Sequence, residues 1–295
     1  MAETPPSLQI GSFKVAFLTD GLWRNDGGCM FGVVPRELWK RDHPPDDLNR
    51  VRLNLSCPLI LRGGEAIVVD TGIGNRLNSE ERKIFSHDDG WLPDHLRALG
   101  LELGDITGVI VSHLHFDHCG GLVRKTESGK LEAAFPRAKV FLQKGELEIA
   151  ENPRNERLHA AYRHAKEIIA PNRGRLEAIE GTLEIIPGLY ATPTGGHTRD
   201  HQIVRVVDDG SSFVHLADIV PTRSHLRGPW NQAYDLDALT TMEQKSRYLS
   251  LAVSERTWVS FAHDDAVFAA RVTNDHGKLV LGEKVPVPEH LREAP

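Results

Sequence analysis

Residues 112–121 read Ser-His-Leu-His-Phe-Asp-His-Cys-Gly-Gly and follow directly on an apolar, β-branched run over residues 106–112. Such a run is typical of a buried strand, so the segment predicts a strand that opens into a polar loop. The loop carries three imidazoles and one carboxylate, which are ligands for zinc and similar divalent ions. Because a rigid strand positions loop ligands precisely, we expect a metal site at this strand end.

The spacing of these four side chains favours two ions over one. Ligands so close in sequence do not all reach one ion, because their backbone positions diverge. A pair of ions lets His113 and His115 bind one, while Asp117 and His118 bind the other. With 15 histidines in 295 residues, the HxHxDH pattern arises by chance in roughly a few such chains per thousand. A polar surface loop is therefore a poor alternative.

Three further candidate ligands follow predicted strands. His197 comes after the apolar segment 183–194 and two glycines, Asp218 follows a strand over residues 212–216, and His263 follows a strand over residues 258–262. Each is a weak signal alone, since Asp and His are common in turns after strands. Together with HxHxDH they complete two coordination spheres, and the carboxylate of Asp218 is suited to bridge both ions.

The rest of the chain alternates strands and helices without a repeat or a linker. We therefore expect one α/β domain over residues 1–295, built as a layered sandwich. Helices are predicted at 91–99, at 156–170 from its amphipathic period, and from an N-cap at Asp237 to residue 253. Other strands are predicted at 13–19, 58–62, 66–70, 139–142 and 202–207, and a turn-rich, glycine-rich segment at 20–32.

Composition excludes several partners. The 35 basic and 41 acidic residues give a net charge of −6, and no block of Lys or Arg suits nucleic acid or an anionic membrane. No apolar run approaches the roughly 20 residues of a spanning helix, and the N-terminus shows no secretory signal. The three cysteines form no CxxC pair, which is typical of the cytoplasm.

The order of HxHxDH, His197, Asp218 and His263 resembles the metallo-β-lactamase superfamily of metal-dependent hydrolases, over nearly the whole chain. The resemblance implies an αβ/βα four-layer sandwich of two mixed sheets flanked by helices, with a dinuclear, usually zinc, site. Histidine and carboxylate ligands also accept Mn, Fe or Co. The resemblance implies a first ion on His113, His115 and His197, a second on Asp117, His118 and His263, Asp218 between them, and Asp70 beside a ligand histidine.

A finer resemblance is to the branch that contains quorum-quenching N-acyl-homoserine lactonases. It is carried by Asp-Gly-Gly-Cys-Met-Phe-Gly at 26–32, Thr-Gly-Ile-Gly-Asn at 71–75, Gly-Gly-His-Thr-Arg-Asp-His at 195–201 and Ala-Asp-Ile-Val-Pro-Thr at 217–222. Methyl-parathion-type phosphotriesterases resemble this branch too. Lactonases of the branch carry a tyrosine three residues after the bridging aspartate, where this chain has Pro221, so Tyr234 or His225 is the candidate substitute.

These features predict a hydrolase that opens lactone esters, most readily N-acyl-homoserine lactones, by attack of a metal-bridging hydroxide. Asp117 or Asp218 would orient the hydroxide and return its proton to the leaving group. The alternative is phosphotriester hydrolysis at the same two ions. No GxSxG nucleophile elbow is present. A glyoxalase II-type thioesterase, an RNA nuclease, a di-iron oxygen reductase and a catalytically inert scaffold fit less well.

We expect the substrate pocket to be lined by side chains of the glycine- or proline-rich loops and by residues beside the ligands. The aromatic residues among them could equally be buried in the core or in a dimer contact instead of lining a pocket. His201 is either a hydrogen-bond partner of a ligand or an ordinary residue at a strand start. By resemblance to the lactonase branch, residues 20–45 are a candidate loop or arm for a homodimer. The pocket candidates are Met30, Phe31, Phe116, His225 and Trp230, with Trp23.

Overall fold

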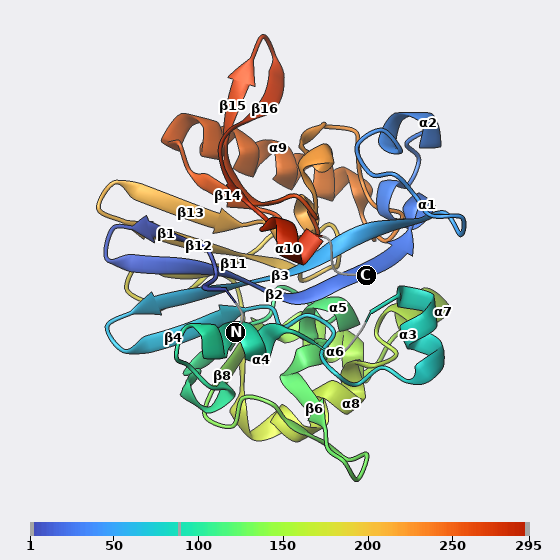
Figure 1. The fold of residues 1–295 in the computed structure, drawn as a ribbon, viewed down its shortest axis with the longest axis vertical. Coiled ribbons are helices and arrows are strands. Elements are labelled where there is room, and N and C mark those ends of the chain that lie inside the picture. Colours follow the sequence, from blue (N-terminus) through green and yellow to red (C-terminus); the bar gives the residue numbers. More distant parts are fainter. Residues whose placement is uncertain (1–2, 88–89, 293–295) are drawn as a thin grey trace.

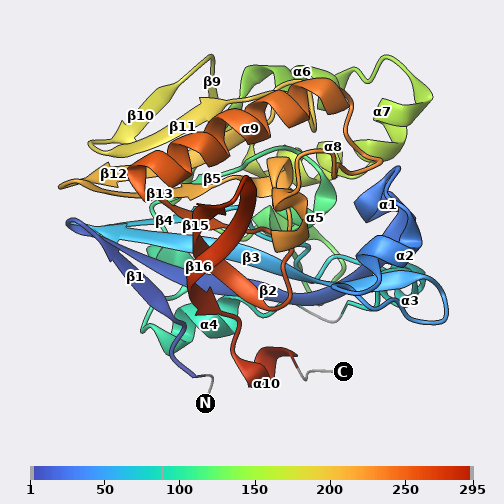
Figure 2. The ribbon, with the colours of Figure 1, turned by 90° about the horizontal axis from the view of Figure 1, so that it is seen from above.

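The computed structural model describes residues 3–87 and 90–292, which form two facing β-sheets with helices on both outer sides (Figures 1 and 2). Each sheet has seven strands, in the orders β1-β2-β3-β4-β5-β8-β9 and β10-β11-β12-β13-β14-β15-β16. Both sheets are mixed, because β4, β5, β8 and β9 run parallel, as do β13 and β14, while the other pairs are antiparallel. The αβ/βα sandwich expected from the sequence is confirmed.

The first sheet comprises β1 (Ser7–Ile10), β2 (Phe13–Asp26), β3 (Arg50–Arg62), β4 (Glu65–Val69), β5 (Gly108–Ile110), β8 (Lys139–Gln143) and β9 (Leu176–Ile179). The second comprises β10 (Leu183–Ile186), β11 (Leu189–Pro193), β12 (Gln202–Asp208), β13 (Ser211–His215), β14 (Trp258–Ser260), β15 (Val267–Asp275) and β16 (Lys278–Pro286). A small hairpin pairs β6 (Val123–Lys125) with β7 (Leu131–Ala133).

The helices near the first sheet are α3 (Ser79–Phe85), α4 (Leu92–Ala98), α5 (Phe116–Cys119), α6 (Lys144–Glu151), α7 (Glu156–Ala161) and α8 (Ala165–Ile169). Helix α9 (Ala238–Glu255) lies on the outer face of the second sheet, and the short helices α1 (Gly27–Phe31), α2 (Arg36–Trp39) and α10 (Glu289–Arg292) lie outside both layers (Figures 1 and 2). Single 3₁₀ turns cover Leu103–Asp105, Gly120–Leu122, Ala170–Arg175, Ala217–Ile219 and Arg223–Leu226.

Three apolar clusters hold these layers together. Phe13, Phe17 and Phe213 belong to the cluster between the two sheets. A second cluster packs the first sheet against helices α4, α6 and α8, and a third packs the second sheet against Tyr248 and Leu249 of α9. Since burial of apolar area is the main favourable term in folding, these clusters provide the rigid frame from which the site loops project. No helix in the described ranges has the length and hydropathy needed to cross a membrane.

The segment at 20–32, expected as a turn-rich loop, is mostly regular structure. Strand β2 continues past a bulge after Thr19 as far as Asp26, paired with β3. Asp26 then caps α1 by accepting from the backbone N–H of Cys29 at 3.1 Å. The polar residues 24–26 read as a turn in the sequence, but the ladder with β3 satisfies their backbone groups. The first part of the candidate dimer arm is therefore paired with its own sheet.

The single helix expected over residues 156–170 is two helices, α7 and α8, separated at Tyr162–His164. At the interruption Tyr162 is buried, and its hydroxyl donates to the carboxylate of Glu146 at 3.0 Å. This buried hydrogen bond to a carboxylate, together with the burial of the Tyr162 ring, stabilises the turn. The tertiary contact thus overrides the amphipathic period.

Candidate metal centre

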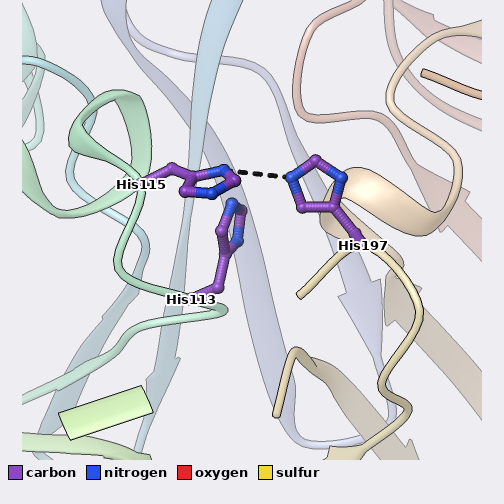
Figure 3. Close-up of side chains that lie close together, drawn as sticks. All are labelled: His113, His115 and His197. Atoms are coloured by element: carbon purple, nitrogen blue, oxygen red, sulfur yellow. Dashed lines mark hydrogen bonds between the residues drawn. The ribbon is translucent and has the colours of Figure 1, made fainter. Parts of the chain in front are cut away.

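The first group of expected ligands forms where two loops meet. His113 and His115 follow β5, and His197 lies in the loop between β11 and β12. Figure 3 shows the three imidazoles pointing toward one another. His197 Nε2 lies 3.1 Å from His115 Nδ1, and each of the three rings offers a nitrogen within 4.8 Å of those of the other two. Three imidazole nitrogens that converge at such distances are an arrangement that suits a shared cation.

A second group lies beside the first. His118, from α5, and His263, which follows β14, bring their Nε2 atoms to 3.2 Å. Asp117 Oδ2 lies 3.5 Å from His263 Nε2 and 3.7 Å from His118 Nε2. The side chain of Asp117 remains 11% exposed, whereas both histidines are 2% exposed. The carboxylate of Asp117 is therefore the member of this group that solvent reaches.

Asp218 lies between the two groups, in the 3₁₀ turn after β13. Its Oδ2 is 3.1 Å from His197 Nε2, and its Oδ1 is 3.3 Å from His118 Nε2 and 3.2 Å from His263 Nε2. One carboxylate thus faces both groups, one oxygen toward each. Within the described part of the chain, His113 Nε2 and Asp218 Oδ1 are buried without a hydrogen-bond partner. Buried polar atoms of this kind fit two cations.

The second nitrogen of four of the candidate ligand rings is held by another group, and for His113 the partner is the neighbouring Ser112, whose Oγ lies 3.0 Å from His113 Nδ1. His118 Nδ1 lies 2.8 Å from Asp70 Oδ2, His197 Nδ1 lies 2.8 Å from Asp235 Oδ1, and His263 Nδ1 lies 3.0 Å from the Asn54 carbonyl oxygen. Such contacts fix the tautomer and the orientation of a ligand imidazole. The Asp70 contact is the one implied by the sequence, whereas Asp235 was missed.

The electrostatics of the cluster follow from burial and charge. Burial, with the neighbouring imidazoles, holds the pKa of His113 and His115 well below its usual range, so both rings are neutral, as metal ligation requires. Burial acts the same way on His118, but the carboxylates of Asp218, Asp117 and Asp70 outweigh it and raise the pKa of that imidazole. The negative charge of the cluster therefore lies on Asp218 and on the two other carboxylates around His118, those of Asp117 and Asp70.

Glu146, at the start of α6, ties the two ligand loops together and was also missed. Its fully buried carboxylate accepts from the Leu114 backbone N–H at 2.9 Å, between His113 and His115, and from the Thr198 hydroxyl at 2.6 Å, next to His197. Burial raises the pKa of Glu146. No local pattern marks this residue, because its partners lie 32 and 52 positions away in sequence.

A cavity of about 300 Å³ opens onto the cluster. Its walls come from β2, α1, α3, α5, α7 and the loop at 232–236, and three candidate ligands reach into it, His115, Asp117 and Asp218. The other lining residues are Trp23, Asn25, Met30, Phe85, Phe116, Arg157, Ala160, Ala161, Arg163, Gln232, Tyr234 and Leu236. The cavity thus combines metal-ligating groups, an apolar wall and two arginines.

Three of the expected pocket residues lie behind this wall, which corrects their assignment. Phe31, His225 and Trp230 are buried and do not line the cavity within the described ranges. Phe31 stacks on His225 with ring centroids 5.2 Å apart, and His225 Nε2 lies 3.0 Å from the Met30 carbonyl oxygen. Their glycine-rich surroundings suggested an open loop, but they form a small aromatic core. Of the candidates named for the pocket, Met30, Phe116 and Trp23 line it.

His201 is buried but does not hydrogen-bond to a candidate ligand among the described residues. Its Nδ1 lies 2.8 Å from Thr194 Oγ1, and its ring centroid lies 5.3 Å from that of His113. Burial lowers the pKa of His201 to about 3. The residue therefore packs as a neutral ring beside the first group of histidines, just before β12.

Known proteins share this fold. The family model of the metallo-β-lactamase superfamily matches residues 52–263. An N-acyl homoserine lactonase from a Bacillus species is 29% identical over 170 residues, which cover 57% of this chain and 60% of the lactonase; the matched stretch thus spans less than two thirds of that relative. The crystal structure of a probable metal-dependent hydrolase from Staphylococcus aureus is 29% identical and aligns with a TM-score of 0.86 over 94% of this chain and 100% of its own.

A product-bound dizinc quorum-quenching lactonase, AidC, aligns with a TM-score of 0.79 at 18% identity, over 97% of this chain and 98% of its own. At this identity the likeness concerns the fold alone.

Proposed function

The chain belongs to the metallo-β-lactamase superfamily of hydrolases, and on that premise we propose that it opens lactone esters, most readily N-acyl-homoserine lactones, at a centre of two divalent ions. The observation that carries the proposal is Asp218, whose two carboxylate oxygens face two separate groups of histidines on the wall of a cavity. The superfamily uses divalent metal ions, typically zinc, and we propose zinc here.

The donor set fits two such ions. The residues that would hold the first are His113, His115 and His197, those that would hold the second are Asp117, His118 and His263, and Asp218 would serve both. When bound, two such ions supply a water of lowered pKa and a Lewis acid for the scissile carbonyl. Imidazole and carboxylate donors in this ratio suit Zn²⁺, and also Mn²⁺, Fe²⁺ or Co²⁺.

The chain's own residues supply the proton transfer. Asp117 lines the cavity with a partly exposed carboxylate, so it can orient a water and pass its proton to the leaving alkoxide. The carboxylate of Asp218 also lines the cavity, and Gln232 Nε2 donates to its Oδ2 at 3.0 Å. That contact holds the carboxylate of Asp218 in one orientation, so we assign the proton transfer to the more exposed Asp117.

Tyr234 is the better candidate for the hydroxyl that the chain lacks at Pro221. It lines the cavity, and its hydroxyl lies 3.3 Å from Asn25 Nδ2. Burial raises the pKa of Tyr234, so the phenol stays protonated and can donate to a substrate carbonyl oxygen. Both ring nitrogens of His225 are already in contact with other groups, Thr222 Oγ1 at 2.8 Å and the Met30 carbonyl at 3.0 Å, so His225 cannot take this role.

Lactones are favoured over phosphotriesters by two observations. The curated relative is named an N-acyl homoserine lactonase, and the apolar wall formed by Trp23, Met30, Phe85 and Phe116 suits an acyl chain. Phosphotriester hydrolysis at the same ions remains the second candidate, because a neutral triester also needs only the metals and an apolar wall.

The experiment is turnover of N-decanoyl-homoserine lactone beside methyl paraoxon, with protein of known metal content. We expect lactone opening to dominate in kcat/KM and to vanish when the metal is removed. Dominant paraoxon cleavage would establish the second candidate. If neither compound reacts while two ions are bound, the lactonase proposal is wrong.

We also propose that two copies of the chain associate through the surface around α1 and α2. Val33 is 93% exposed there, and Leu38 and Leu48 are also exposed; such apolar surface is a common feature of interfaces. Sedimentation should give a dimer at micromolar concentration, and a monomer would exclude this association. The cytoplasmic location stays a prediction from the sequence.

A further inference from the structure

The cavity carries two arginines that the proposed hydrolysis does not use, Arg157 and Arg163. Arg157 belongs to α7, and Arg163 to the turn that follows it. Helix α7 lies on the same side of the molecule as α1 and α3, which also contribute to the cavity wall (Figures 1 and 2). A hydrocarbon chain makes no favourable electrostatic interaction with a neighbouring cation. The two guanidinium groups are therefore better suited to a polar or anionic part of a substrate.

Arg157 is fixed in place but not neutralised. Its Nη2 donates to the carbonyl oxygens of Ala233 at 2.8 Å and Asp235 at 3.1 Å. Among residues 3–87 and 90–292, no carboxylate oxygen lies within 4.0 Å of its guanidinium, and its Nε and Nη1 make no hydrogen bond. The two carbonyl contacts therefore hold a charged fork on the cavity wall with donors to spare.

Arg163 differs from Arg157 in this respect. Its Nη2 lies 3.6 Å from Glu81 Oε1, so part of its charge is compensated. The carboxylates that line the cavity, Asp117 and Asp218, face the histidine cluster instead. The charge of Arg157 is thus the one on this side of the cavity that has no carboxylate partner in the described chain.

We propose that Arg157 forms an anion subsite, and that the substrate is a lactone or ester whose acyl part ends in a carboxylate. This inference rests on the proposed function and narrows its substrate class. Because Nη2 already donates to the two carbonyls, the guanidinium offers its free Nη1 and Nε donors, with the full charge, to a carboxylate, and since it is held in advance the entropic cost is small. Arg163 adds a weaker positive charge to the same side of the cavity.

The test compares two lactones of equal length, N-hexanoyl- and N-adipoyl-homoserine lactone, which differ only in a terminal methyl or carboxylate. The metal-loaded wild type should show kcat/KM about tenfold higher for the adipoyl compound, mainly through KM. Added salt should reduce the preference, since the subsite is partly exposed.

Matched variants separate charge from loop support. Arg157→Gln removes the charge and, because its side chain is shorter, also the contacts with the two carbonyls; it should bring the preference to about one while the hexanoyl lactone is still hydrolysed if the loop stays in place. Arg157→Lys keeps the charge and should keep part of the preference. Arg154→Ala, at an exposed neighbour outside the cavity, should leave the preference unchanged. If all the variants keep the wild-type ratio, Arg157 only supports the loop and the subsite does not exist.

A binding measurement keeps this test independent of turnover. The probes are the two ring-opened products, N-adipoyl- and N-hexanoyl-homoserine, titrated into metal-loaded protein by calorimetry. If neither lactone is hydrolysed but the adipoyl product binds more tightly and Arg157→Gln abolishes the difference, the lactonase proposal fails and the subsite stands. If the hexanoyl compounds are hydrolysed and bound as well as the adipoyl compounds, the subsite fails and the lactonase proposal is unaffected.

Discussion

The histidine cluster and the cavity wall beside it are built in different ways. The cluster consists of mostly buried side chains on loops that leave β5, β11, β13 and β14, and four of its rings are held by a hydrogen bond from outside the cluster. The wall combines buried aromatic rings with exposed side chains such as Arg157, Arg163 and Tyr234, from short helices and a long loop. Rigid strand ends suit precise ligation, whereas the variable wall suits a choice among substrates. Changes in the cluster should therefore alter metal content and kcat, and changes in the wall should alter KM and preference.

Asp218→Ala gives the largest expected effect, because it removes the one carboxylate that faces both groups of histidines. We expect lactone turnover to fall about a thousandfold or more, with loss of bound metal measured by elemental analysis. Asp47→Ala, at an exposed aspartate far from the cluster in the sequence, is the control and should behave as wild type. A variant that keeps both ions and normal kcat would mean that Asp218 serves neither ion.

Asp117→Asn tests whether this residue carries the proton as well as contributing to the cluster. The amide keeps the shape of the side chain but loses its charge and basicity, so we expect kcat to fall by about two orders of magnitude. Steady-state kinetics on protein of measured metal content provides the readout. Near-normal kcat with two ions bound would rule out the proton-transfer role.

Glu146→Gln and Asp235→Asn test the groups that hold the ligand loops. The carboxylate of Glu146 accepts from residues next to candidate ligands, and the carboxylate of Asp235 contacts the ring of His197 itself. Each substitution removes one of these carboxylates. Loss of such outer partners typically weakens metal affinity by about 10- to 100-fold, which competition with a chelator measures. Glu148→Gln, on the exposed face of the same helix α6, should leave the affinity unchanged. An equal change in Glu148→Gln would show that the effect is not specific to the ligand loops.

Phe116→Ala and Phe31→Ala test which aromatic side chain lines the cavity and which one belongs to the core behind it. Phe116 lines the cavity, so its truncation should cost a long-chain lactone about 5- to 10-fold more kcat/KM than a short-chain one. Phe31 lies behind the wall in an aromatic cluster, so its truncation should lower the free energy of unfolding by about 3–5 kcal/mol without changing chain-length preference. If Phe31→Ala instead changed the chain-length preference and left the free energy of unfolding unchanged, Phe31 would belong to the pocket.

Local signals predicted a layered α/β domain and the ligand-rich loops, whereas the four-layer arrangement and the grouping of the seven candidate ligands came from the resemblance to the superfamily. A buried strand followed by a ligand-rich loop is visible within a short segment, as at 106–118. Asp70 was placed beside a ligand histidine by the resemblance to the superfamily. The predicted strand at 13–19 stopped too early because the residues from Asp20 and Gly21 onward look turn-rich, whereas pairing with β3 extends β2 to Asp26.

Groups that act across the fold could not be predicted. Glu146 and Asp235 are single acidic residues without a motif, and only the folded chain brings them to the loops of His113 and His197. The same holds for Arg157, because nothing in the amphipathic period around it indicates a neighbouring cavity. Phe31 was assigned to the pocket because glycine-rich surroundings indicate a loop, and His225 as a candidate substitute for the tyrosine absent at Pro221, but burial of aromatic area draws such side chains into a core.

The central claim is that two ions together make this site active, and a metal titration tests it most directly. Metal-free protein is titrated with Zn²⁺ while hydrolysis of N-decanoyl-homoserine lactone and bound zinc are measured in parallel. We expect the activity to rise with the second equivalent and to level off at two ions per chain. Full activity at one equivalent, or binding of only one ion at saturation, would contradict the two-ion account.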